Sequence, residues 1–193
     1  MRSLPALALL LVLAACDSAS SPDGELVANT FTVQVGDGPV ETRGEAHVGT
    51  YESAFSGGTV ALLLGARPLS GPLSLSSPAI GFAYDGVTVT KGTYPLAALD
   101  PREAPPEAAF TGVYINPDET VGGEPGWAGF YYTGEGTLTL DSLSTERALG
   151  SFSMRALELD PQNSQPTGAE VQIRGTFHAV RTDAFGDEDA FWQ

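Results

Sequence analysis

Apolar and polar residues alternate with a period of two along much of this 193-residue chain, and this alternation constrains the fold more than any other feature. Phe31, Val33 and Val35 fall on one side of a strand, with polar residues between them. No stretch shows a capped apolar stripe at helical spacing, and the most helix expected is one turn at Thr145–Leu149. The pattern predicts an all-β domain, an antiparallel β-sandwich or barrel of about 8–11 short strands.

Turn residues divide the alternating pattern into segments. Gly36–Pro39 is expected to turn the chain so that Val40–Val48 returns as the second strand of a hairpin. The other expected strands are Thr59–Leu64, Ala79–Tyr84, Val87–Val89, Thr93–Leu96, Ala109–Ile115, Gly129–Thr133, Thr137–Leu140, Ser151–Leu157 and Val171–Val180. Ala97–Glu107 and Asn116–Gly126 are rich in Pro or Gly and are expected to be loops, because Pro cannot donate to a strand ladder.

The N-terminal residues have the pattern of an export signal. Arg2 precedes the apolar run Leu4–Val12, which is too short to span a bilayer of ~30 Å as a stable helix. The sequence Leu-Ala-Ala-Cys at 13–16 resembles the lipobox of bacterial lipoproteins. The resemblance implies cleavage after residue 15, followed by a diacylglycerol and an acyl chain, such as palmitate, on Cys16. No other cofactor is expected.

Lipidation of Cys16 has consequences for location. One acyl chain binds membranes only marginally, whereas two or three give stable anchoring. The resemblance therefore implies an exported protein on the inner or outer membrane, facing the periplasm or the cell surface. Asp17 resembles a signal that retains enterobacterial lipoproteins at the inner membrane, a rule that other phyla ignore, so both membranes remain open. The alternative is ordinary secretion, with cleavage near Ser18–Ser20.

Composition divides the chain into four parts. Residues 1–15 form the signal peptide, and residues 16–25 carry the lipidated Cys and a Ser-, Asp- and Gly-containing flexible tether. Residues 26–182 are expected to form the all-β domain. Residues 183–193 form an acidic and aromatic tail.

Four pentads share glycine, a hydroxyl residue and then an apolar residue. They are Gly92–Leu96, Gly136–Leu140, Gly150–Met154 and Gly175–Ala179. Their irregular spacing excludes a solenoid or propeller, and the pentads are expected to start strands. Together with the lipobox, the arrangement from Gly44 to Val180 resembles a broad group of uncharacterised small all-β envelope lipoproteins. That group has no established activity, so the resemblance implies a fold and no function.

The densest aromatic group surrounds one of the expected loops. Trp127, Tyr131 and Tyr114 are candidates for a ligand platform, because exposed aromatic rings stack on sugars or anchor protein interfaces. The favoured interpretation is nevertheless that these rings belong to the core, and the platform is the alternative. In a strand, Phe130 and Tyr132 face one way and Tyr131 the other, so at most part of the group is exposed.

Two histidines and a carboxylate cluster were weighed as chemical sites. His47 and His178 lie in expected strands and, with carboxylates nearby, would be able to bind a metal or transfer protons. Asp183, Asp187 and Asp189 are weak calcium candidates that lack the spacing of a calcium loop. We expect no metal and a solvated acidic tail. The tail's aromatic residues are expected to fold back onto the sheet, and they are Phe185, Phe191 and Trp192.

Motifs and charge limit the function. The chain has no Gly-x-Ser-x-Gly elbow and no Ser-x-x-Lys motif, so no catalytic residue is nominated. Its 24 acidic and 9 basic residues give a charge of −15, which disfavours binding to nucleic acid. The expected function is a non-enzymatic, lipid-anchored envelope lipoprotein with a binding or scaffolding role, whose partner is the membrane and an envelope protein or glycan. The alternatives are a lipocalin-like carrier of an apolar small molecule and an envelope hydrolase.

The acidity predicts that salt stabilises the fold. Cleavage after residue 15 removes Arg2 and no acid, leaving 24 acidic against 8 basic side chains, a charge of −16. Because added salt screens repulsion between exposed charges, we expect the melting temperature to rise across a sodium chloride series. Thermal denaturation followed by circular dichroism measures it, with sucrose as an uncharged control. A flat melting temperature across the salt series would contradict the expectation.

Overall fold

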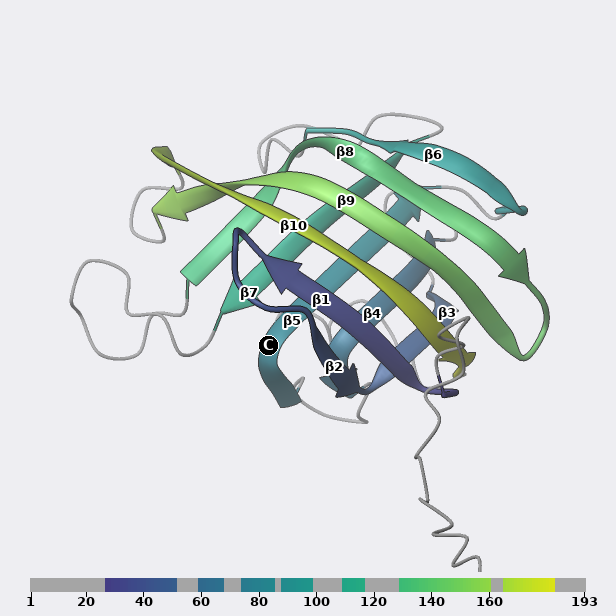
Figure 1. Cartoon of the computed structure of the whole chain (residues 1–193). Coiled ribbons are helices and arrows are strands. Elements are labelled where there is room, and N and C mark those ends of the chain that lie inside the picture. The colour runs from purple at the N-terminus through teal and green to yellow at the C-terminus, as the bar shows by residue number, and fades with distance from the viewer. Residues whose placement is uncertain are drawn as a thin grey trace, which may run out of the picture.

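The chain forms ten β-strands and no helix within the residues that the structure describes. The computed structural model describes residues 27–51, 59–67, 74–85, 88–98, 109–116, 129–160 and 165–182. The strands are β1 (Thr30–Val35), β2 (Glu41–Gly44), β3 (Ala46–Tyr51), β4 (Thr59–Arg67), β5 (Ser74–Asp85), β6 (Gly92–Leu96), β7 (Phe110–Asn116), β8 (Gly129–Leu143), β9 (Arg147–Asp160) and β10 (Gln165–Arg181) (Figure 1). The all-β class and the expected number of strands are confirmed.

All ten strands belong to one sheet, and the sheet closes on itself. Its pairings run from β3 through β4, β5, β7, β8, β9 and β10 and back to β3. The closing contact between β10 and β3 is parallel and short, with Val180 opposite His47 and Arg181 opposite Val48. The hairpin of β1 and β2 extends the sheet along β10, and β6 pairs with β8. The result is a barrel-like fold.

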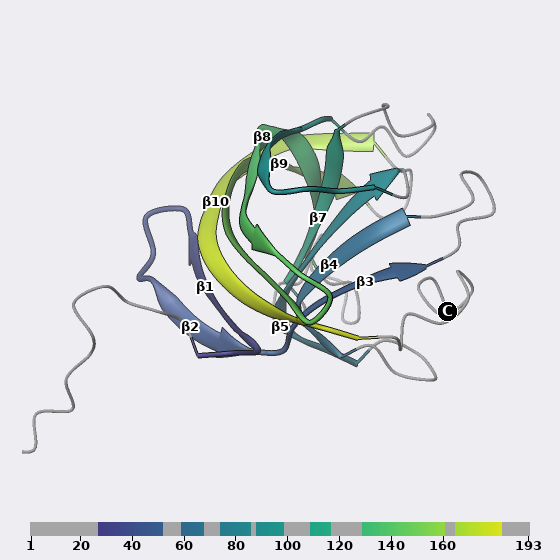
Figure 2. The same cartoon turned by 90° about the vertical axis from the view of Figure 1, so that its right-hand side faces the viewer.

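The barrel is flattened into two sides that enclose the core. In Figure 1, β1, β6, β8, β9 and β10 lie on the near side, and β3, β4, β5 and β7 cross behind them at a steep angle. Figure 2 shows the two sides from the end, with the strongly curved β10 on the left and β3 and β4 on the right. The long strand β8 joins the two sides, because its first residues pair with β7 and its later residues pair with β6. Strand β9 pairs with β8 along most of this length.

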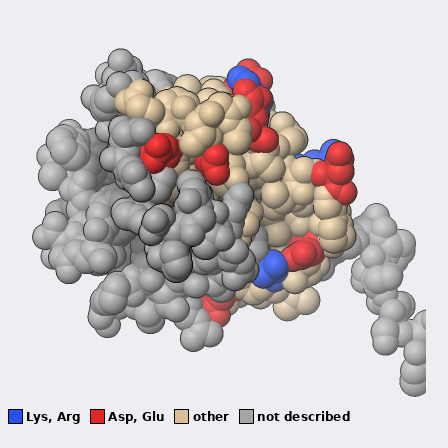
Figure 3. All heavy atoms as spheres, turned by 90° about the vertical axis from the view of Figure 1, so that its left-hand side faces the viewer, with Lys and Arg blue, Asp and Glu red and all other residues tan. Residues whose placement is uncertain are grey.

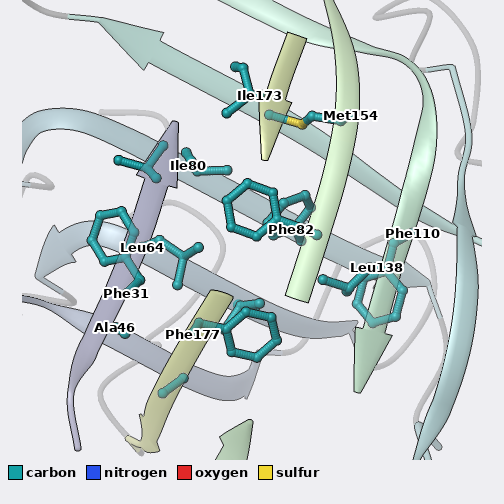
Figure 4. Close-up of a cluster of buried hydrophobic side chains, with 14 of the residues drawn as sticks. Phe31, Ala46, Leu64, Ile80, Phe82, Phe110, Leu138, Met154, Ile173 and Phe177 are labelled. Carbon is teal, nitrogen blue, oxygen red and sulfur yellow. The ribbon is translucent and has the colours of Figure 1, made fainter. Parts of the chain in front are cut away.

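Alternate residues of nearly every strand point into the space between the two sides. Phe31, Phe82, Phe110 and Phe177 are among the largest side chains with less than 2% of their surface exposed (Figure 4). Phe82 also packs against Phe152, with ring centroids 5.2 Å apart. A cavity that admits water gives its lining side chains accessible surface, and these side chains have almost none. The interior around them is therefore filled, at the density normal for protein cores.

The glycine pentads owe their composition to this packing. In the register of β9 and β10, Gly150 lies opposite Phe177 and Gly175 opposite Phe152. A Cβ added at Gly150 would come within 2.8 Å of the Phe177 ring, and one at Gly175 within 2.9 Å of the Phe152 ring. Each glycine thus makes room for the phenylalanine of the neighbouring strand, an arrangement known from sheets in which aromatic rings cover glycine backbone.

Several sequence expectations about strand limits were wrong. Gly136, Gly150 and Gly175 lie inside β8, β9 and β10, so their pentads do not start strands, whereas Gly92 does begin β6. Gly129–Thr133 and Thr137–Leu140 belong to one strand, β8. Thr145–Leu149 forms no helix, because the chain turns at Ser144, whose backbone N–H donates to the Arg147 carbonyl at 2.9 Å, and then enters β9.

The returning strand of the first hairpin is divided in two. It was expected to run without a break from Val40 to Val48, but β2 ends at Gly44 and β3 begins at Ala46. Glu45 between them has φ of +67°, a left-handed conformation that breaks the strand. Of the expected strand Val87–Val89, Thr88 and Val89 lie outside any strand, and Val87 lies outside the described residues.

The glycine–phenylalanine pairs predict a marked cost for a single methyl group. We expect Gly150→Ala to lower the free energy of unfolding by about 1–3 kcal/mol, because the Cβ would clash with the Thr139 carbonyl and the Phe177 ring. Gly44→Ala is the matched control, because its Cβ would meet nothing closer than the Asn29 carbonyl at 3.9 Å. Urea unfolding followed by circular dichroism measures both. Equal stability of the two variants would refute the packing argument.

Candidate functional site

The lipidation candidate, Cys16, lies outside the described residues, and the described chain begins at Val27. Val27 is exposed, and two residues later the Asn29 N–H donates to the carbonyl of His178 at 2.8 Å. The chain therefore enters the barrel beside the C-terminal end of β10. Within the described ranges, no helix is long and apolar enough to cross a membrane.

Two of the three platform candidates lie in the core. Tyr114 on β7 and Tyr131 on β8 are register partners, with ring centroids 5.4 Å apart and ring planes tilted by 43°. Their exposed fractions are 4% and 7%, and both belong to the main apolar cluster. Trp127 lies outside the described residues. The core alternative therefore describes Tyr114 and Tyr131, whose rings have too little exposed surface to stack on a ligand from solvent.

The neighbouring aromatic residues follow the expected alternation. Phe130 and Tyr132 point away from the core, opposite to Tyr131. Tyr132 pairs with Val113 on one side and with Leu157 on the other, and it is nevertheless 8% exposed. The outer surface at this point is therefore apolar and covered.

The two histidines come together on the outer surface of the closing strands. His47 on β3 pairs with Val180 on β10, and His178 lies two residues from Val180 on the same face. His47 Nε2 is 3.2 Å from a carboxylate oxygen of Glu45. The register thus places the two histidines on neighbouring strands, a point that the sequence alone did not decide.

Glu45 combines a left-handed backbone conformation with the contact to His47. Its φ is +67°, and its carboxylate lies beside the imidazole two residues later. The Glu45 carbonyl accepts a hydrogen bond from Gly65 at 2.8 Å, which ties this kink to β4. Among the described residues, no group of three or more His, Cys, Asp or Glu side chains is arranged to hold a metal ion. The calcium candidates Asp183, Asp187 and Asp189 lie outside the described residues.

A row of hydroxyl side chains crosses the outer surface of β6, β8, β9, β10 and β1. In register, Thr93 lies opposite Thr139, Thr139 opposite Ser151, and Ser151 opposite Thr176. Thr176 and Thr32 on β1 continue the row through a hydrogen bond of 2.8 Å between their hydroxyls. We call this surface the hydroxyl face, and it consists of Thr32, Thr93, Thr137, Thr139, Ser151, Ser153 and Thr176.

The hydroxyl face is exposed or half-buried and carries little charge. A second row lies beside the first, in which Thr137 is opposite Ser153 and Ser153 is opposite Arg174. The Nε of Arg174 donates to the side-chain oxygen of Gln34 at 2.9 Å. Gln172 donates to the hydroxyl of Ser153 at 3.0 Å. Hydroxyl, amide and guanidinium groups in regular rows offer donors and acceptors to a hydroxyl-rich or polar partner. The pentads contain these residues, but only the register brings them side by side.

Charged side chains border this surface in pairs. Arg155 lies 2.9 Å from Glu170 and 3.1 Å from Glu135. The hydrogen bond and charge of Glu170 raise the pKa of Arg155 above its ordinary value. On the face shown in Figure 3, the acidic residues of the described chain are spread out and do not form one patch. This distribution suits solvation more than a site for one cation.

Comparisons with known proteins found no match: no family model, no curated protein and no solved structure is similar to this chain. Function must therefore be argued from the residues themselves. The described surface has a hydroxyl face with exposed donors and acceptors. It also has the pair of His47 and Glu45, which does not belong to a group of three potential metal ligands within the described residues.

The burial of the tyrosine pair predicts a structural effect for its removal. We expect Tyr131→Ala to lower the free energy of unfolding by about 3–5 kcal/mol, as for other large aromatic residues of a core. Thr137→Ala on the same strand is the control, and its effect should stay within about 0.5 kcal/mol. Urea titration of both variants measures the difference. A Tyr131→Ala protein as stable as the control would restore the platform interpretation.

Proposed function

We propose that this protein is a lipid-anchored lipoprotein of the bacterial cell envelope, with a non-enzymatic β-domain that binds or scaffolds an envelope protein or glycan. The observation that carries the proposal is the position of Cys16, the one cysteine of the chain, directly after Leu-Ala-Ala. The thiol occupies the place at which a lipobox receives its diacylglycerol.

The distance between the anchor and the domain supports this proposal. Residues 16–26 span at most about 36 Å when fully extended. Their Ser, Asp, Pro and Gly content is typical of a flexible linker. A tether of this length keeps the domain near the membrane surface and leaves its outer faces accessible to neighbouring envelope components.

The filled interior favours binding on the outside over the carriage of a small apolar molecule. Met154 and Ile173, like the phenylalanines around them, have less than 2% of their surface exposed. A carrier needs an apolar cavity of about 300 Å³ or more. The hydroxyl face is the candidate contact surface, because its regularly spaced donors and acceptors are exposed and few charges interrupt them.

The anchor is tested by the mass of the mature protein. We expect mass spectrometry of the membrane-extracted wild type to find residues 16–193 with a diacylglycerol and an acyl chain. Cys16→Ala should lose that mass and leave the membrane fraction. Ser18→Ala, which preserves the cysteine, is the matched control and should stay lipidated. A wild-type protein without acyl mass would sink the proposed localisation.

The binding role is tested in the same strains by chemical crosslinking in intact cells. We expect adducts of the wild type to be lost in Thr139→Arg, because an arginine in the middle of the hydroxyl face blocks close contact. Glu146→Arg, an exposed substitution in the turn before β9, is the control and should keep the adducts. If both variants give the same adducts, the hydroxyl face is not the contact surface for the partner. Co-purification of an apolar small molecule would favour the carrier instead.

A further inference from the structure

The outer surface of the barrel differs sharply between its two sides. On the near side of Figure 1, the hydroxyl face is open to solvent. On the far side, the outward residues of β4, β5 and β7 whose side chains the structure describes are small or apolar, apart from Thr111. We call this second surface the apolar outer face, and it consists of Ala61, Leu63, Ala79, Ala83, Val113 and Ile115.

The register places these side chains outside the barrel and next to one another. Leu62 and Leu64 belong to the core cluster, so Leu63 between them points outward. Leu63 lies opposite Gly81, which lies opposite Val113. A Cβ added at Gly81 would come within 3.3 Å of Val113 and 3.5 Å of Leu63. The two side chains therefore meet over the glycine and form a continuous apolar surface.

Half of this surface is withdrawn from water, whereas Ala83, Val113 and Ile115 are half-buried. The exposed fractions are 2% for Ala61, 5% for Leu63 and 4% for Ala79. In Figure 2, no described strand lies outside β3 and β4. Outward side chains of a single sheet stay exposed unless other residues lie on them. Segments outside the described ranges are therefore the candidates for this cover.

We propose that residues 183–193 of the same chain bind across the apolar outer face and bury their aromatic side chains there. The described chain ends next to this face, because the Thr182 N–H donates to the Val48 carbonyl on β3 at 3.0 Å. Strand β3 is the neighbour of β4. Eleven residues reach up to about 36 Å, which exceeds the ~14 Å from β3 across β4 and β5 to β7.

The composition of this C-terminal segment matches the surface. Phe185, Phe191 and Trp192 supply large apolar rings that Ala61, Ala79 and Gly81 leave room for. Asp187, Glu188 and Asp189 stand between Phe185 and Phe191, and in this arrangement their carboxylates would face water. The other segments outside the described ranges connect two strands or lie before Val27, and only the C-terminal segment contains three large aromatic residues. Burial of such rings is strongly favourable because each removes a large apolar area from water.

Fluorescence of Trp192 tests the proposal directly. The chain has two tryptophans, so Trp127→Phe leaves Trp192 as the sole indole. Every protein carries Cys16→Ala to exclude acyl chains. We expect Trp192 to emit at a shorter wavelength in the folded protein than in urea, and to be protected from acrylamide. Emission and quenching that are the same in both states would overturn the proposal.

Substitutions on the face separate specific binding from general burial. Leu63→Arg should shift Trp192 emission to longer wavelength, whereas Thr137→Arg on the hydroxyl face should leave it unchanged. Should Leu63→Arg fail to fold, a chain ending at Thr182 is the second variant, with a lower urea midpoint and stronger binding of an apolar dye expected. Unchanged midpoint and dye binding would contradict the proposal. If the burial of Trp192 disappears when the protein is diluted until it is monomeric, the face is covered by a second copy of the chain, and the proposal is overturned.

Discussion

The reciprocal packing of glycine and phenylalanine between β9 and β10 is the constraint on which the rest of the fold depends. Gly150 lies opposite Phe177 and Gly175 opposite Phe152, so each ring occupies space that any other residue would take. Phe152 continues this packing to Phe82 on the far side of the barrel. Because these rings fill the interior, the two sides of the sheet approach closely and no large internal site remains around them. This packing favours the proposed contact surface on the outside of the barrel.

The sequence predicted the strands and the faces of most residues, because a period of two determines which side chains share a side. It favoured the core for the aromatic group, as found for Tyr114 and Tyr131, but did not decide that Tyr131 points inward and Tyr132 outward. Period alone assigns residues to the same side and leaves open which side is buried. The division of the first returning strand at Glu45 was also missed, since glutamate carries no local signal for a left-handed conformation.

Side-by-side arrangements across strands lay further beyond sequence reasoning. The hydroxyls of Thr93, Thr139 and Ser151 are separated along the chain and meet only through the register of β6, β8 and β9. The pentads indicate part of the register, because Gly150 and Gly175 each lie opposite a phenylalanine of the neighbouring strand. The lipidation candidate Cys16 is different in kind. It depends on a local motif, so the sequence alone supports it and the fold adds nothing to it.

The ends of the described domain suggest how an anchored protein would be oriented. Asn29 binds the carbonyl of His178 and Thr182 binds that of Val48, so the chain enters and leaves beside the same end of β10. A lipid on Cys16 would therefore hold this end toward the membrane. The other end of β10, near Gln165, would point away, because a 17-residue strand extends for up to about 56 Å. The hydroxyl face spans β6, β8, β9, β10 and β1 between these ends, where a neighbouring envelope component would reach it from the side.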